Sequence, residues 1–423
     1  MTVGQERGQA GLRGLRHAAG RLSSDYAYWL VAYALFVTLL GSILPTPLYV
    51  LYQSRWHFSA AVLTAIFAIY PGGVLVALLV VGRLSDVIGR RRVLLPSLFL
   101  SAASAVMFAL AQGVIWLLVA RLTIGLAVGM CTGTATAALA ELHPRHDTRR
   151  SALVGSVATS GGLAVGPLLA GLLAQYAPWS TVLVFLIFLG LLVPAILGVS
   201  AMPETAPVTS SGARWQLQHL SVPTQMRGPF ILASVVVFCS FAVLSLFTAM
   251  APSFVTTLLH VHNRAVGGAV ATIVLVAATA AQLTLRRMSN RAAMGVGAVL
   301  LATGLGLVIV AASAQSLILF VLSAVCAGLG QGLTFMGSLV LVNGLAPATQ
   351  RGAVASSYFV VVYLAGGIPV LSIGVAITRL GFYRATVAYG GVVGALALAA
   401  GATVSWGALR SDTLTSMRTV QKE

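Results

Sequence analysis

The stretch GRLSDVIGRRR, residues 82–92, is a short charged loop between two long apolar runs, 60–81 and 93–111. Each run has the ~20 residues that a helix needs to cross a bilayer. The whole chain shows this pattern, because 58% of its 423 residues are hydrophobic and only 8% are charged. An average soluble domain has roughly 25% charged residues. The expected solvent of this fold is therefore lipid.

Twelve such apolar runs predict an all-α polytopic membrane protein with twelve transmembrane helices. The expected spans are 27–50, 60–81, 93–111, 114–138, 152–174, 179–200, 229–251, 265–285, 292–312, 316–342, 353–376 and 383–406. A polar, proline-containing connection separates six spans from six. We expect an N-terminal segment 1–26, a six-helix half 27–200, a central linker 201–228, a second six-helix half 229–406 and a tail 407–423.

The formal net charge of +17 comes from basic clusters between apolar runs and not from a basic domain, so nucleic-acid binding is not expected. Twenty of the 25 basic residues lie in the terminal segments and in the loops after even-numbered helices, and four lie in the other loops. The positive-inside rule then places both termini in the cytoplasm. Abundant Arg, Ala, Gly and Val suggest a bacterial source, hence a multi-pass protein of the inner (plasma) membrane.

The two halves contain an internal repeat. The marker residues of the first half are Gly125, Gly129, Pro144, Arg149 and Pro167, and those of the second are Gly328, Gly332, Pro347, Arg351 and Pro369. The offset is 203 for the first three pairs and 202 for the last two. Duplication is the simplest account, and two related halves are typical of transporters that rock about a site between them.

The loop 82–92 resembles the hallmark Gly-x-Leu-x-Asp-x-x-Gly-Arg-Arg of the major facilitator superfamily at every hallmark position. Pro203-Glu204-Thr205, directly after the sixth span, is another short signature often seen in that superfamily. The resemblance covers essentially the whole chain. It implies the major facilitator fold, with two pseudo-symmetric six-helix halves around a midplane cavity, and transport of a small solute by alternating access.

Charges at the predicted cytoplasmic rim suggest an inner gate. Asp86 can accept hydrogen bonds from the positive N-terminus of a neighbouring helix, and Arg90 can pair with Glu141. The residues that we assign to this gate are Gly82, Asp86, Gly89, Arg90, Glu141, Arg149 and Arg351. The alternative is that Arg90, Arg91 and Arg92 only obey the positive-inside rule.

Arg121 is the only ionisable residue well inside any predicted span. Placing an arginine there costs at least ~2.5 kcal/mol, which favours a functional role over a purely structural one. In the resembled superfamily, the matching arginine faces the central cavity and is implicated in proton coupling in drug:proton antiporters. This resemblance makes Arg121 the coupling candidate. The repeat places Ala324 at the corresponding position of the second half.

Two helices carry small residues at helical spacing, which allow close packing. Gly125 and Gly129 follow Arg121 on one face of the fourth helix. In the fifth helix, residues 162–171 resemble the Gly-x-x-x-Gly-Pro-x-x-Gly-Gly motif of the antiporter branch, with Ala170 in place of one glycine. We assign Gly125, Gly129, Gly162, Gly166, Pro167 and Gly171 to packing and pivoting. Tight packing without a pivot is the alternative.

Aromatic and amide residues on the helices that line the cavity in the resembled fold are candidates for solute contact. They are Tyr33, Tyr49, Tyr70, Phe247, Gln331, Phe335, Tyr358 and Tyr363. Each of them has packing or lipid contact as its alternative role. The two prolines near the end of the first helix, Pro45 and Pro47, are expected to loosen that end.

Several chemistries have no motif in this sequence. No phosphate-binding glycine loop, metal-ligand spacing or nucleophile motif occurs, so we expect no enzyme, no cofactor and no metal. Cys131, Cys239 and Cys326 all lie in apolar spans, and no disulfide is expected.

The resemblance of the fifth helix to the antiporter motif and the buried Arg121 favour proton-coupled efflux of a small apolar or amphipathic solute. No acid lies deep within a span and no span contains a histidine, so an uncoupled facilitator or metabolite exporter is the alternative. A non-transporting membrane sensor and a membrane-embedded enzyme are the alternatives from other classes. The expected partners are a small-molecule substrate, H⁺ as coupling ion and the lipid bilayer, with the protein acting as a monomer.

Overall fold

The computed structural model describes residues 23–81, 84–143, 145, 147–205, 220–261, 263–347 and 350–420. Side chains are described for these residues except 86, 148–149 and 405–420. Within this part of the chain, twelve helices are long and apolar enough to cross a membrane. The predicted all-α fold class is confirmed.

The first half contains the helices up to the central linker. They are α2 (Ser24–Ile43), the 3-10 helix η1 (Thr46–Leu48), α3 (Tyr49–Trp56), α4 (Ala60–Val81), α5 (Leu84–Ile88), α6 (Arg90–Ala109), α7 (Val114–Leu142), α8 (Thr148–Tyr176) and α9 (Ser180–Ala201). The first span combines α2, η1 and α3, and the short α5 lies in the loop between α4 and α6.

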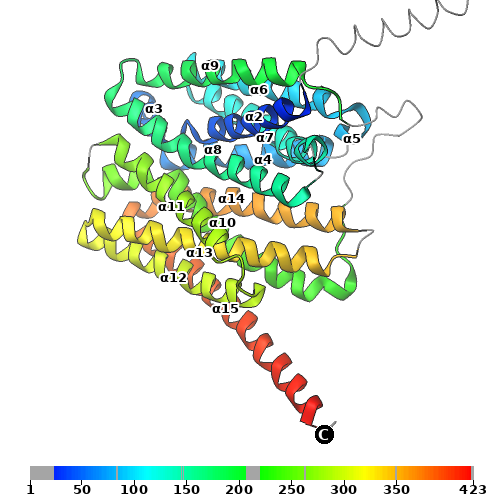
Figure 1. Cartoon of the computed structure of the whole chain (residues 1–423). Helices are drawn as coiled ribbons and strands as arrows, with labels where there is room; N and C mark the ends of the chain where they lie inside the picture. The colour runs from blue at the N-terminus through cyan, green and yellow to red at the C-terminus, as the bar shows by residue number, and fades with distance from the viewer. Residues whose placement is uncertain are drawn as a thin grey trace, which may run out of the picture.

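The second half follows the same plan. It contains η2 (Thr224–Met226), α10 (Arg227–Thr257), α11 (Arg264–Thr284), α12 (Asn290–Ala314), α13 (Leu317–Leu345), α14 (Arg351–Leu380) and α15 (Phe382–Val420). Figure 1 shows this half, coloured green to red, below the blue-to-green first half.

The packing pattern repeats between the halves. In the first half, α7 packs against α4 and α6, α6 against α9, and α2 against α8. In the second, α13 packs against α11 and α12, α12 against α15, and α10 against α14. These are equivalent pairs under the sequence repeat, so the duplication predicted from sequence extends to the arrangement of the helices.

The halves meet mainly in two helix pairs, α4 with α14 and α8 with α11, and η1 of the first half also contacts α10 and α11. We name the two ends of the bundle by a residue at each, the Arg90 end and the Arg264 end. At the Arg264 end, a Cβ built on Gly374 of α14 would overlap the Thr64 side chain of α4. The crossing of α4 and α14 is therefore close enough to require a glycine.

The first span differs from the continuous helix expected over 27–50. Its helix α2 ends at Ile43 and a second helix begins at Tyr49, with one 3-10 turn between them. Pro45 and Pro47 have no N–H to bond the carbonyls four residues earlier, those of Gly41 and Ile43, so the α-helical ladder cannot continue through them. The expected loosening is a break in the helix.

The last helix also runs further than expected. Its backbone stays helical to Val420, through the segment 407–420 that we assigned to a tail. Figure 1 shows this part of α15 projecting beyond the bundle. The apolar portion that qualifies as a span ends at Val404, close to the predicted 406.

Candidate functional site

Arg121 is held inside the first half, where only 1% of its surface is exposed. Its Nε donates a hydrogen bond to the Tyr49 hydroxyl, and its Nη1 donates one to the backbone carbonyl of Ser42. Its Nη2 is buried and has no hydrogen-bond partner among the described residues. The side chain predicted from sequence as a coupling candidate therefore still has donor groups available.

Three aromatic rings surround the same guanidinium. The distance from Cζ of Arg121 to the ring centroid is 4.9 Å for Phe67, 5.3 Å for Tyr49 and 5.6 Å for Tyr70. A cation within about 6 Å of a ring centroid is attracted by the quadrupole of the ring. This aromatic cage, defined as Tyr49, Phe67 and Tyr70, stabilises the charge of Arg121 without an acid.

The break in the first span adds to this stabilisation. Ser42 is the second-last residue of α2, so its carbonyl belongs to the negative end of the helix dipole. A cation favours that position, and Arg121 occupies it. Tyr49 is the first residue of α3, on the other side of the break. Arg121 thus contacts both parts of the broken span.

Two glycines bring α7 close to α4, which carries two of the three rings. A Cβ on Gly125 would lie 2.4 Å from the Tyr70 carbonyl oxygen, and one on Gly129 would lie 2.6 Å from the Ala77 Cβ. Both distances are shorter than any real contact, so only glycine fits. A third glycine of the same helix, Gly133, has nothing within 4 Å and takes no part in this packing.

The second half repeats this packing without the charge. Gly328 and Gly332 of α13 approach α11, where a Cβ would lie 2.4 Å and 2.2 Å from the carbonyl oxygens of Val274 and Ala278. Ala324, which corresponds to Arg121, is fully buried. The two halves are therefore alike in helix packing and unlike in chemistry.

The glycine motif of α8 has two packing faces. One face contacts α2, where a Cβ on Gly162 or Gly166 would lie 2.3 Å or 2.9 Å from the carbonyl oxygens of Phe36 and Leu40. The other face contacts α11 of the second half, where a Cβ on Gly268 would lie 2.3 Å from the Pro167 carbonyl oxygen. Gly171 also packs on Gly268.

Hydrogen bonds reinforce the crossing of α8 and α11. The Thr272 hydroxyl donates to the Ala164 carbonyl at 2.8 Å. Nearer the Arg264 end, Arg264 donates through its backbone N to Gln175 at 3.0 Å and through Nη1 to the Ala174 carbonyl at 3.3 Å. The motif that suggested a pivot therefore lies on a contact between the two halves.

At the Arg90 end, the structure pairs the two gate residues that sequence reasoning paired. Arg90 Nη2 lies 2.9 Å from Glu141 Oε1, and its Nε lies 3.3 Å from the same oxygen. The Nη1 of Arg90 donates to the Ser85 hydroxyl at 2.8 Å. These contacts join α5, α6 and α7 within the first half.

Glu204 joins the Arg90–Glu141 cluster, although sequence reasoning did not assign it to the site. Its carboxylate accepts hydrogen bonds from the backbone N of Arg90 at 2.6 Å and of Arg91 at 3.2 Å, so it caps the start of α6. Thr205 donates to Glu141 at 2.5 Å. The only signal in the sequence was the short Pro203-Glu204-Thr205 signature, which did not specify a partner.

Gly89 allows this contact. Its φ of +107° is a conformation that residues with a side chain rarely adopt, and a Cβ there would lie 2.4 Å from Glu204 Oε2. The other assigned gate residues contribute less to the observed geometry. Arg351 is exposed at the start of α14, whereas Gly82 and the side chains of Asp86 and Arg149 lie outside the described part of the chain.

The residues expected to contact the solute do not gather at one place in the structure. The Tyr33 hydroxyl donates to the Leu191 carbonyl of α9 at 2.9 Å, and the buried Tyr358 hydroxyl lies 2.7 Å from the Ser338 hydroxyl. Both bonds stay within one half. Phe335 packs edge-on against Phe241, with ring centroids 5.4 Å apart.

Tyr49 and Tyr70 belong to the aromatic cage, and Tyr70 and Tyr363 are each partly exposed. Gln331 is buried in α13, where its backbone carbonyl accepts a hydrogen bond from Ser240. Of the eight candidates for solute contact, Tyr49 and Tyr70 have their rings within about 6 Å of the Arg121 guanidinium.

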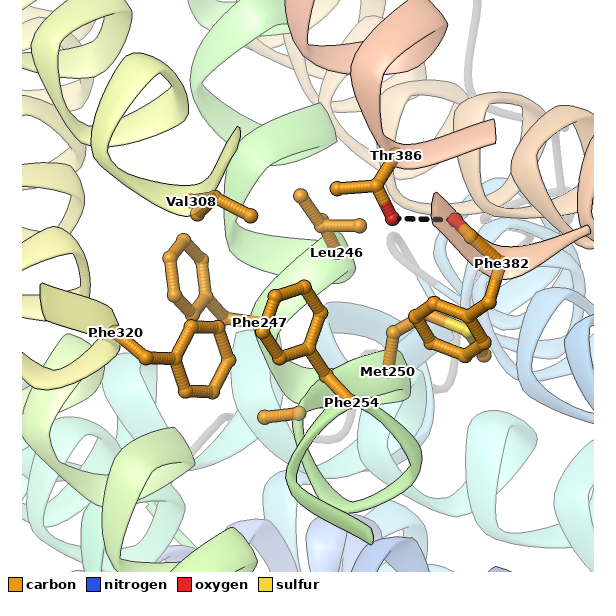
Figure 2. A pocket seen from close by; sticks show the side chains of 9 residues that line it. Leu246, Phe247, Met250, Phe254, Val308, Phe320, Phe382 and Thr386 are labelled. Atoms are coloured by element: carbon orange, nitrogen blue, oxygen red, sulfur yellow. Dashed lines mark hydrogen bonds between the residues drawn. The ribbon is translucent and has the colours of Figure 1, made fainter. Parts of the chain in front are cut away.

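Phe247 lies in a small apolar pocket of the second half, shown in Figure 2. Its ring stacks on Phe320, which in turn stacks on Phe254 at a centroid distance of 4.2 Å. The enclosed space is about 10 Å³, which is room for about one water molecule. This pocket is too small for a transported solute.

The twelve long apolar helices in the described part of the chain are those of a multi-pass membrane protein. The chain belongs to the major facilitator superfamily, because residues 31–370 match the Major Facilitator Superfamily. An uncharacterized MFS-type transporter of Mycobacterium tuberculosis is 34% identical over 110 residues, which are 26% of this chain and 16% of that protein. An uncharacterized transporter of Schizosaccharomyces pombe is 33% identical over 100 residues, 23% of this chain and 17% of that protein.

Solved structures agree with this fold. A nucleoside transporter superposes with a TM-score of 0.71 at 14% identity and covers 89% of this chain and 99% of its own. A bacterial homologue of the human lysosomal transporter Spinster, in an inward-facing unoccupied conformation, gives 0.70 at 15% identity, covering 90% and 97%. At such low identity these likenesses establish the fold alone.

Proposed function

We propose that this protein exports a small apolar or amphipathic solute through the inner (plasma) membrane in exchange for protons, by alternating access. Arg121 is the coupling residue in this proposal, and the Arg90–Glu141 pair with Glu204 forms the inner gate. Both termini lie in the cytoplasm and the protein acts as a monomer, without enzymatic activity.

The observation that carries the proposal is the position of Arg121. Its two hydrogen bonds reach the two sides of a broken span, so a change in its charge environment acts on both parts of that span. Irregular backbone within a membrane is tolerated where it is buried in protein or lines a cavity, and in other transporters such breaks mark binding sites.

A motion of one half against the other has support in the contacts between α8 and α11. These contacts combine glycine packing with the hydrogen bonds of Arg264 and Thr272. Glycine-to-backbone surfaces have no interlocking side chains, so one helix can slide on the other without side-chain repacking. The basic residues at the Arg90 end support the cytoplasmic assignment of that end.

A second candidate is uncoupled transport. Of the described carboxylates, none pairs with Arg121, and Glu141 already pairs with Arg90. A proton-coupled transporter usually has a titratable group that exchanges protons with each side in turn. An uncoupled facilitator or metabolite exporter would need no such group.

Proteoliposomes that contain the purified protein and an internal pH-sensitive dye distinguish the two. A proton gradient is imposed and a panel of lipophilic drugs and metabolites is added, one compound at a time. Coupled export predicts proton movement that depends on one compound and is lost in Arg121→Ala. Compound flux without proton movement would favour the uncoupled candidate, and an Arg121→Ala variant with normal coupled flux would refute the role of Arg121.

A further inference from the structure

The donor groups of Arg121 indicate what kind of solute the protein carries. We propose that the solute has an anionic oxygen head group, of carboxylate or sulfonate type, and that the Arg121 guanidinium binds it. This inference rests on the proposed transport function and specifies its substrate class.

The first argument is the number of free donors. A guanidinium has five N–H groups, and two of them are used, by Tyr49 and by Ser42. The Nη2 atom, with two N–H groups, is buried and has no acceptor among the described residues. Donors in this planar fork match two oxygens of one head group.

The second argument is charge. Glu141 lies 20 residues further along α7, which corresponds to about 30 Å, and it pairs with Arg90. Asp25 is exposed in the first turn of α2, about 25 Å from Ser42. Neither carboxylate neutralises Arg121. A cationic solute would be repelled at this site, whereas an anion would supply the missing negative charge.

The third argument is the surroundings of the guanidinium. The aromatic cage offers ring faces to an apolar body attached to the head group, and Tyr70 is partly exposed. The adjacent residue Pro71 lies against Gly366 of α14, so Tyr70 sits where the two halves meet. An amphipathic anion would fit this combination of one cation and several rings.

A second unpartnered atom lies in the same break. The buried Thr46 Oγ1 has no hydrogen-bond partner among the described residues. Thr46 lies between Ser42 and Tyr49, the two residues that Arg121 bonds. A buried hydroxyl without an acceptor is a second donor within the break that is available to a polar ligand group.

Binding to the full-length protein in phosphatidylcholine nanodiscs tests the inference. The probe is radiolabelled naphthalenesulfonate, which stays charged across the working pH range. The competitors are naphthalenesulfonamide, of similar shape but neutral, and naphthyltrimethylammonium, which is cationic. We expect saturable sulfonate binding at least about tenfold tighter than that of the sulfonamide, the ratio for one charge-assisted hydrogen bond, and no competition by the cation.

Variants then assign the preference to one side chain. Arg121→Gln should reduce the sulfonate-to-sulfonamide ratio to about one, because the fork and its charge are lost. Arg379→Gln, which removes an exposed arginine at the end of α14, should leave the ratio unchanged. Arg121→Lys keeps the charge and loses the planar fork, so the ratio should fall below that of the wild type but stay above one. This variant decides the question if Arg121→Gln does not fold.

Three results would overturn the inference: no saturable sulfonate binding by the folded wild type, equal competition by the sulfonamide, or an Arg121→Gln variant that keeps the preference. The proposed function is tested independently of this substrate class. A neutral compound that drives proton movement in proteoliposomes, with no preference for anions in nanodiscs, would leave proton-coupled export standing and refute only the anionic substrate.

Discussion

Replacing Gly89 by alanine should weaken the gate at the Arg90 end. Gly89 has φ +107° and ψ +152°, a backbone region in which a residue with a Cβ pays roughly 1–3 kcal/mol. The new Cβ would lie 2.4 Å from Glu204 Oε2, so the carboxylate must move away from the backbone N atoms of Arg90 and Arg91. Losing such a cap costs about 0.5–2 kcal/mol. The combined effect is roughly 1.5–5 kcal/mol on the start of α6.

Hydrogen exchange measured by mass spectrometry reports this effect locally. Backbone amides at the start of α6 should exchange about tenfold to several thousandfold faster in Gly89→Ala, because each 1.4 kcal/mol is a factor of ten. Glu204→Ala removes the cap without the backbone strain and should give a smaller increase. Gly344→Ala is the matched control, since a Cβ at Gly344 meets nothing within 4 Å. Exchange in Gly89→Ala within threefold of wild type would refute the reasoning.

Three further predictions concern the gate, the contact between the halves and the energetics. Glu141→Gln removes the acid partner of Arg90 at a cost of about 1–3 kcal/mol, so it should lower the melting temperature in detergent. Asp25→Asn, at an exposed acid, should leave the melting temperature unchanged, and equal melting temperatures for the two variants would contradict this prediction. Gly268→Val should reduce transport, because a Cβ at Gly268 would collide with the Pro167 carbonyl oxygen at the contact between α8 and α11. Gly306→Val is the control and should have a smaller effect, since a Cβ at Gly306 meets nothing within 4 Å. Export of a monovalent anion in exchange for one proton moves the equivalent of two positive charges inward, whereas export of a neutral solute moves one. An inside-negative potential of about 60 mV, set by a potassium-valinomycin clamp, should therefore raise the steady-state solute gradient roughly 100-fold for the anion and roughly tenfold for a neutral solute.

The number and type of the spans could be predicted from the sequence because they depend on run length and composition alone. The ends of the helices were less accurate. The expected end of the seventh span at 251 lies six residues before the end of α10 at Thr257. Polar residues such as Ser253 and Thr256 lower the local hydropathy, but they do not interrupt a helix that packs on its neighbours.

The two central side chains of the site could also be predicted. Arg121 is conspicuous because it is charged within an apolar run, and Glu141 because Arg90 needs an acid near the same rim. Their surroundings could not be predicted to the same extent. Phe67 is one aromatic residue among many in apolar spans, and nothing in its sequence context distinguishes a cage residue from a packing residue.

The contacts of Glu204 and Tyr49 depend on tertiary structure. The contact from Glu204 to the Arg90 N joins residues 114 positions apart, and the contact from Arg121 to Tyr49 joins residues 72 apart. A single sequence has no signal for such pairs. The break at Pro45 and Pro47 was visible as a weak point, but the capping of its Ser42 carbonyl by an arginine from another helix was not.

Alternating access is the central claim, and cross-linking across the α8–α11 contact tests it most directly. The Asn263 side chain lies 3.2 Å from the Tyr176 hydroxyl, across the two halves at the Arg264 end. Cysteines at these two positions, joined by a short cleavable bismaleimide in proteoliposomes, would hold that end closed. We predict that cross-linking abolishes solute-dependent transport, that cleavage of the linker restores it, and that modification of either single-cysteine variant has little effect. Full transport by the cross-linked protein would contradict the account.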